Sequence, residues 1–164
     1  MSYQEKKTIV SLVTGALILI SYCIYAFGKA GIAHLNDLQF WAKTMLIFIG
    51  IGIVVMIVIQ IVFHILMAIS KAVQQKLNDH EVDEAEIERS MKNLTVEDEM
   101  DQLIELKANR FGYTTIGLGF VAGLISIAFG VSATALLNIL FFSFWAGSFL
   151  EGLVQIRYYR RGIR

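Results

Sequence analysis

The stretch from Thr95 to Gly130 decides the fold of this chain, and it reads TVEDEMDQLIELKANRFGYTTIGLGFVAGLISIAFG. Its first part is charged, with apolar residues recurring at the spacing of a helix, and its second part is apolar and rich in small residues. No proline occurs in the chain, so no proline interrupts a helix at the junction between the two parts. The stretch therefore predicts a helix that leaves water and enters a membrane.

The composition of the whole chain favours the same environment. Of its 164 residues, 56% are hydrophobic, which is more than the core of one soluble domain of this size holds. Fourteen basic residues balance fourteen acidic ones, so no overall charge favours nucleic acid, which we exclude as a partner. Cys23 is the single cysteine and lies within an apolar run, so we expect a small buried residue and no intramolecular disulfide.

Four apolar segments are long enough to cross a bilayer, which requires roughly 20 residues each. We predict an all-α integral membrane four-helix bundle forming a single membrane domain over residues 1–164. The expected spans are residues 8–28, 41–70, 111–131 and 135–156. Ala26 and Gly28 have the spacing of a signal-peptidase site, but the first apolar run is longer than a usual signal sequence, so we interpret it as an uncleaved helix. Asn36 or Asp37 is expected to cap the second helix, followed by Phe40 and Trp41 at the membrane interface.

Residues 71–110 contain eleven of the fourteen acidic residues and are predicted to form a helical cytoplasmic loop between spans two and three. Within it, Thr95 to Asp98 resembles a capping box, which predicts that a new helix starts there. The apolar side of that helix is expected to contact the bilayer or a partner, and Lys107 and Arg110 mark its junction with the membrane span. The residues proposed for that apolar side are Val96, Met100 and Leu103.

An acidic helical face earlier in the loop carries His80, Glu84 and Glu88 at four-residue spacing. Such ligands are able to hold a divalent ion, but no recognised metal motif includes them, so we predict a solvated face and no metal.

A stripe of small residues runs along one side of the third span. At 100° per residue its members fall within an arc of about 100°. They are Gly112, Thr115, Gly119, Ala122, Gly123, Ser126 and Gly130. We call this set the small-residue stripe. Because small residues let helix backbones approach closely in lipid, it predicts a helix-packing surface, either within one chain or between copies in a homo-oligomer.

Polar residues inside the spans form a second candidate site. Glu151 and His64 each lie about 10 Å inside the expected cytoplasmic boundary, and Gln60 and Thr115 are further polar candidates. One interpretation is a polar site in which Glu151 and His64 accept a proton or cation. The alternative is a structural ion pair of Glu151 with Lys107, Arg110 or an arginine of the tail.

The segment from Asp98 to Arg110, DEMDQLIELKANR, resembles the motif DERD.LIELK..R of the DUF2178-like proteins, small four-span membrane proteins of bacteria and archaea. The ending from Glu151 to Gly162, with its YYRRG sequence, is similar to the end of the same proteins. Met100 departs from the pattern, which often has arginine there. The resemblance implies a four-span architecture without an assigned activity, and a regulatory or stress-related role through helix-turn-helix regulators encoded beside such proteins.

No nucleophile elbow, phosphate-binding glycine loop or catalytic histidine motif occurs in the sequence, so an intramembrane enzyme is the least favoured interpretation. We expect a non-enzymatic multi-pass membrane protein of the accessory, regulatory, sensor or immunity type, without a cofactor. Its expected partners are the lipid bilayer, further copies of itself, and a cytoplasmic or membrane protein. The alternative is a small transporter or channel that uses Glu151 and His64.

Basic residues predict the orientation in a prokaryotic plasma membrane. With four spans, twelve Lys and Arg residues share one side with both termini, and only Lys29 and Lys43 lie on the other. The positive-inside rule then places the amino and carboxyl termini in the cytoplasm. A green fluorescent protein fused after Arg164 is expected to fluoresce, because that reporter folds in the cytoplasm. Activity only of a reporter that requires export would contradict this orientation.

Overall fold

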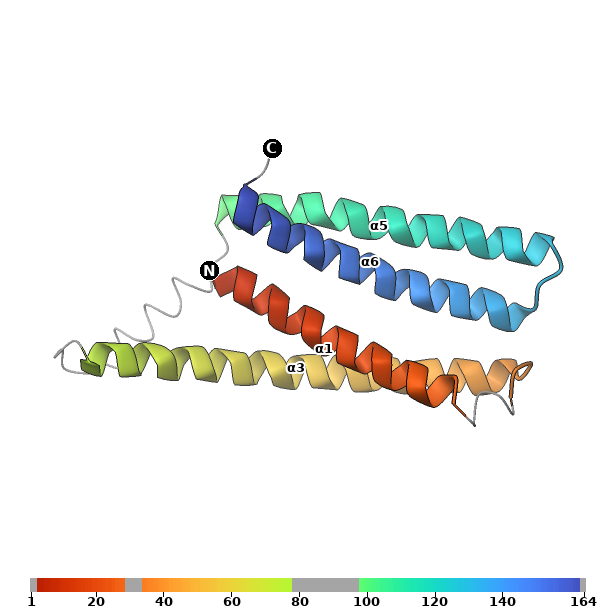
Figure 1. Ribbon diagram of the computed structural model, residues 1–164, viewed down its shortest axis with the longest axis horizontal. Helices are drawn as coiled ribbons and strands as arrows, with labels where there is room; N and C mark the ends of the chain where they lie inside the picture. Colours follow the sequence, from red (N-terminus) through yellow and green to blue (C-terminus); the bar gives the residue numbers. More distant parts are fainter. Residues whose placement is uncertain (1–2, 29–33, 78–97, 163–164) are drawn as a thin grey trace.

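The structure is a computed structural model that describes residues 3–28, 34–77 and 98–162. The described residues form four long helices, which are α1 (Tyr3–Ala26), α3 (Leu38–Leu77), α5 (Glu99–Ala128) and α6 (Ala133–Arg161) (Figure 1). All four are long and apolar enough to cross a membrane. The predicted all-α fold is therefore confirmed, with four helices of spanning length and composition, and the chain is a multi-pass membrane protein. Val96, His80, Glu84 and Glu88 lie outside the described residues.

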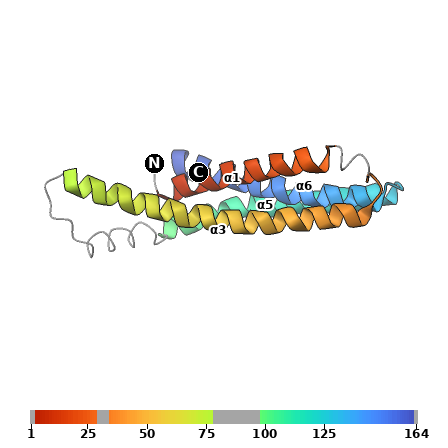
Figure 2. The ribbon, with the colours of Figure 1, turned by 90° about the horizontal axis from the view of Figure 1, so that it is seen from below.

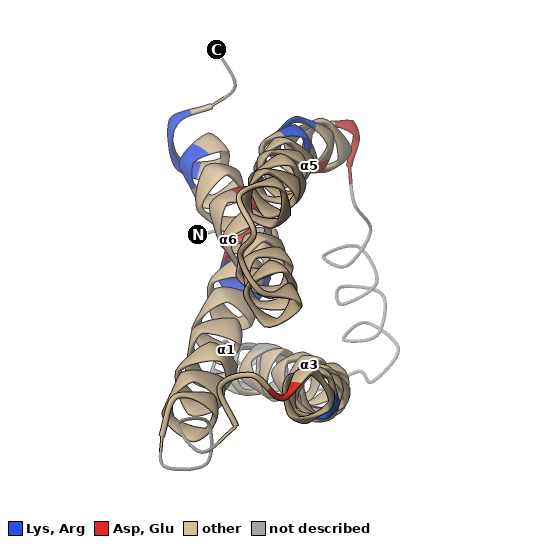
Figure 3. Ribbon diagram, turned by 90° about the vertical axis from the view of Figure 1, so that its right-hand side faces the viewer, with Lys and Arg blue, Asp and Glu red and all other residues tan. Residues whose placement is uncertain are grey.

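The four helices alternate in direction, so that the described ends near both termini lie at one end of the molecule (Figure 1). We call this the terminal end. The helix α5 packs on α6, α6 on α1, and α1 on α3, and α3 also touches α6. Among the described residues no comparable packing joins α3 to α5, so these four helices pack in the order α5, α6, α1, α3 (Figure 3).

Side chains at the helix starts explain where three of the helices begin. Asp98 caps α5 by accepting from the backbone N–H of Asp101 at 2.7 Å, and the Asp101 carboxylate faces the Asp98 N–H at 3.4 Å. The capping box of α5 is thus Asp98 to Asp101, and the box predicted to begin at Thr95 lies outside the described residues. Asp37 caps α3 as predicted, and Ser132 caps α6.

The helix α3 is longer than its predicted span. Its 40 residues amount to about 60 Å at the helical rise, roughly twice the thickness of a bilayer's hydrocarbon core. It projects past the other helices at the terminal end (Figure 2). The first residues of the predicted loop therefore continue α3, as the length of this apolar run had indicated.

The small-residue stripe of α5 packs against α6 of the same chain. A Cβ atom built on Gly147 of α6 would lie 2.8 Å from the carbonyl oxygen of Gly112, and one built on Gly119 would overlap Ser143. A Cβ on Gly123 would lie 2.6 Å from a methyl group of Leu136. The two backbones therefore approach each other as closely as the missing side chains allow.

The last residue predicted for the stripe has a different role. Gly130 follows the end of α5, adopts φ +78° and has no atom within 4 Å of a built Cβ. It belongs to the turn between α5 and α6, where a positive φ favours glycine, and it does not extend the packing surface.

An aromatic cluster joins α1, α3 and α6 at the end opposite the termini. Tyr22 is fully buried there, with the rings of Phe48, Phe141 and Phe142 within 6.0 Å of its own. Trp41 is 2% exposed and donates from Nε1 to the carbonyl oxygen of His34. Trp41 is thus a core residue near the start of α3, and its position at the membrane interface stays a prediction. Cys23, predicted to be buried, is half-buried against this cluster.

The close approach of α5 and α6 makes a stability prediction. Gly147→Ala is expected to lower the free energy of unfolding in detergent by about 1–3 kcal/mol, because the added methyl group meets the Gly112 backbone and Ile116. Gly117→Ala is the matched control, since a Cβ at Gly117 has open space. Equal stabilities of the two variants would contradict the packing described.

Candidate functional site

A cavity of about 720 Å³ lies between α1, α3 and α6, and the first turns of α5 close part of it. The residues from α1 and α3 are Gln4, Lys7, Thr8, Ser11, Leu12, Gly15, Ile18, Phe48, Ile49, Gly52, Ile53, Met56, Ile57 and Gln60. Those from α5 and α6 are Asp101, Glu105, Phe144, Trp145, Ser148, Phe149, Glu151, Gly152, Gln155 and Tyr159. The volume is within the range of about 300–1,000 Å³ that is usual for small-molecule sites.

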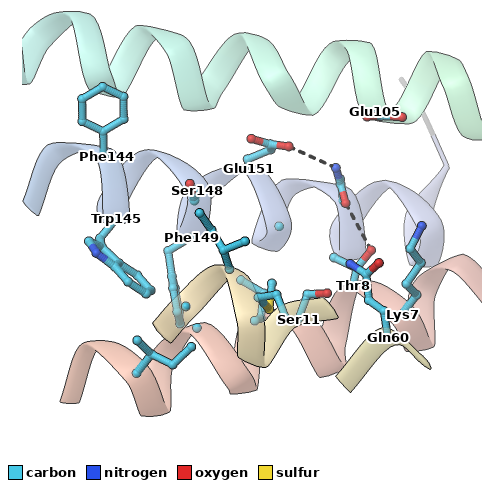
Figure 4. Close-up of a pocket in the computed structure, with 18 of the residues that line it drawn as sticks. Lys7, Thr8, Ser11, Gln60, Glu105, Phe144, Trp145, Ser148, Phe149 and Glu151 are labelled. Carbon is cyan, nitrogen blue, oxygen red and sulfur yellow. Dashed lines mark hydrogen bonds between the residues drawn. The ribbon is translucent and has the colours of Figure 1, made fainter. Parts of the chain in front are cut away.

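The lining of this cavity changes from polar to apolar along its length. At the terminal end it contains Lys7, Thr8, Gln60 and Glu105, whereas Trp145 and its neighbouring aromatic residues line the opposite end (Figure 4). The order follows from the antiparallel helices, because the start of α1 lies beside the end of α6 and the later part of α3. The cavity is therefore amphipathic.

Glu151 lies on the wall of the cavity and is held by neutral amides. With the Asn109 amide oriented so that its nitrogen faces α6, Nδ2 donates to Glu151 Oε1 at 2.7 Å. Gln155 Nε2 donates to the same oxygen at 3.4 Å and its own Oε1 accepts from Thr8 at 3.1 Å (Figure 4). Among residues 3–28, 34–77 and 98–162, no ion pair involves Glu151. This arrangement offers the cavity a carboxylate whose hydrogen-bond partners are neutral side chains.

The structure places the other predicted polar residues in different surroundings. Gln60 lines the cavity, but His64 does not, and its Nε2 lies 2.9 Å from the hydroxyl of Tyr3. Thr115 donates to the carbonyl oxygen of Phe111 in its own helix. Glu151 and His64, which we expected in one polar layer, therefore do not share this cavity.

The predicted partner surface at the start of α5 is only partly described. Met100 and Leu103 are exposed, Lys107 is half-buried and Arg110 is exposed. The buried face of this segment is instead formed by Ile104 and Ala108, which continue the line of Gly112 towards α6 at four-residue spacing. Whether the exposed residues meet a partner stays a prediction.

Two contacts at the start of α1 were not predicted from the sequence. Glu5 is 4% exposed, and its Oε1 lies 2.7 Å from Arg160 Nε near the end of α6. Leu12 packs where Gly152 leaves room, because a Cβ on that glycine would lie 2.7 Å from the Leu12 side chain. Thr8, Ser11 and Gly15 recur at helical spacing and signal the face involved, whereas no local pattern identifies Glu5 or its partner.

Comparison with known proteins adds no family assignment, since no protein-family model, curated protein or solved structure matches this chain. The resemblance to the DUF2178-like proteins thus stays a prediction.

The contacts of Glu151 predict how its variants behave. Glu151→Leu is expected to lower the free energy of unfolding by about 1–3 kcal/mol, because the Asn109 and Gln155 amides lose their acceptor. Glu151→Gln keeps an acceptor oxygen and is expected to cost clearly less. Unfolding of the purified protein in mild detergent measures both. An equal loss in the two variants would instead indicate that the negative charge itself is paired in the folded protein.

Proposed function

We propose that this protein is a non-enzymatic membrane protein of the sensor or regulatory class that binds a small molecule in the cavity beside Glu151. In the orientation predicted from the basic residues, the polar end of the cavity lies at the cytoplasmic side. A membrane-embedded site of this kind would report the presence of its ligand to proteins at that surface.

The observation that carries this proposal is a carboxylate that pairs with no basic side chain of the described residues, on the wall of a cavity large enough for a ligand. An ionisable side chain at this depth is costly in lipid, so a purely structural carboxylate would be expected to face a basic partner. Glu151 instead accepts hydrogen bonds from two neutral amides. This favours the polar-site interpretation over the structural ion pair.

Contacts at the start of α1 supply a route from the cavity to the terminal end. Thr8 bonds to Gln155, the neighbour of Glu151, and three residues earlier Glu5 bonds to Arg160. A ligand that displaces α1 from α6 would strain both contacts together. We propose that the ends of α1 and α6 are the parts whose positions respond to binding.

The second candidate function is transport of a proton or cation, which the same carboxylate favours because no basic side chain of the described residues pairs with it. In that case Glu151 acts without His64, because His64 lies outside the cavity. Proteoliposomes separate the two functions. A transporter shows flux that Glu151→Gln abolishes, whereas a sensor shows no flux above that of empty liposomes.

A cavity-filling variant tests ligand binding. Gly52 lines the cavity and a Cβ there meets nothing within 4 Å, so the side chain of Gly52→Phe enters the cavity without a clash at its first atom. We expect the natural protein, purified in mild detergent, to carry a small molecule that native mass spectrometry detects as an added mass. Gly52→Phe is expected to lose it.

Gly50→Phe is the matched control for this experiment. It introduces the same side chain into the same helix, also with open space around its Cβ, but Gly50 does not line the cavity. We expect this variant to retain the added mass. Absence of any added mass from the natural protein, or equal loss from both variants, would overturn the proposed function.

A further inference from the structure

The charged groups and the shape of the cavity indicate which class of molecule it binds. Resting on the proposed function, we infer that the ligand is an amphipathic monocation, an alkylated ammonium or pyridinium group attached to an apolar tail. Its cationic group would lie near Glu151 and Glu105, and its tail would extend towards Trp145.

The charge of the polar end is the first argument. Asp101, Glu105 and Glu151 contribute three carboxylates to the lining, against the single ammonium group of Lys7. Asp101 belongs to the cap of α5, where the positive end of the helix dipole offsets its charge. Glu105 and Glu151 remain, and no ion pair with Lys7 neutralises either within the described residues. A cation is therefore attracted to this end and an anion repelled.

The spacing of these carboxylates makes a compact metal ion a less favourable ligand of the cavity than an organic cation. No group of three His, Cys, Asp or Glu residues in the described parts of the chain is close enough together to hold a metal. Glu151 is also occupied by two amide donors. An organic cation needs no complete set of oxygen ligands, because its charge is spread over a bulky group that tolerates amides and hydroxyls as neighbours.

The apolar end of the cavity is the reason for inferring an apolar tail on the ligand. From Gln4 to Ile18 the lining face of α1 extends about 21 Å, and its far part lies against Trp145, whose ring is 3.4 Å from a Cβ built on Gly15. Phe149 and Met56 line the space between the two ends. A small hydrophilic cation would leave this surface without a partner, whereas a tail of about ten carbons fills it.

(10-Bromodecyl)trimethylammonium is a suitable probe because the bromine at the end of its tail quenches tryptophan fluorescence on contact, and the tail is the part expected beside Trp145. The chain has two tryptophans, so Trp41→Phe leaves Trp145 in the cavity as the only reporter. In nanodiscs of phosphatidylcholine, we expect saturable quenching that Gly52→Phe removes and Gly50→Phe preserves. Decyltrimethylammonium should compete with the probe, and decanesulfonate, which has the same tail and the opposite charge, should not.

Substitutions of single carboxylates test the role of charge. Glu151→Gln is expected to raise the half-quenching concentration roughly tenfold, because one attractive charge is lost while the side-chain shape is kept. Glu99→Gln is the control, since Glu99 is exposed on α5 and does not line the cavity, and should leave that concentration unchanged. Native mass spectrometry with the same probe on the unsubstituted chain provides a readout that does not depend on replacing Trp41.

The outcomes separate this inference from the proposed function. Equal competition by decanesulfonate, or an equal effect of Glu151→Gln and Glu99→Gln, would overturn the cationic ligand while leaving a binding cavity. No saturable binding of either charged compound, together with no added mass on the natural protein, would overturn both.

Discussion

The close approach of α5 and α6 at Gly112 and Gly147 is the constraint on which the other helix contacts depend. The backbones of the two helices are in contact there because both residues are glycines. Such close packing is a main source of helix association in lipid, where burying apolar side chains gives no hydrophobic gain. It aligns the two helices along their length and turns Glu151 towards Asn109. The antiparallel pair of α5 and α6 thereby provides the surface on which α1 and α3 pack.

The helix α1 connects this pair to α3. Gly152 admits the side chain of Leu12, and polar contacts of Glu5 and Thr8 fix the same helix at the terminal end. Among the described residues, α3 packs on α1 and α6, and no comparable packing joins α3 to α5. The cavity is thus a consequence of which helix pairs have complementary surfaces, and its polar end follows from the polar residues that each helix carries near the termini.

Much of the fold was predictable because its signals are local. Apolar runs of spanning length predicted the four helices, and the small-residue stripe predicted a packing face. The partner of that face was not predictable, since a glycine surface serves equally within a chain and between chains. Gln60 and Glu151 were recognised as polar residues in apolar segments, but Asn109 and Glu5 contact residues far away in the sequence, and nothing in their own neighbourhood indicates this.

The central claim is that a cation in water reaches the cavity beside Glu151. Its most direct test is the modification rate of Ser148→Cys, a cavity residue, by methanethiosulfonate ethyltrimethylammonium, with Cys23 replaced by serine so that one thiol remains. If a cation reaches the cavity, Ser148→Cys is modified much faster than Leu124→Cys, which is exposed on the surface of α5 outside the cavity, and Gly52→Phe suppresses the modification of Ser148→Cys. Equal rates at the two positions, or no effect of Gly52→Phe, would contradict the claim.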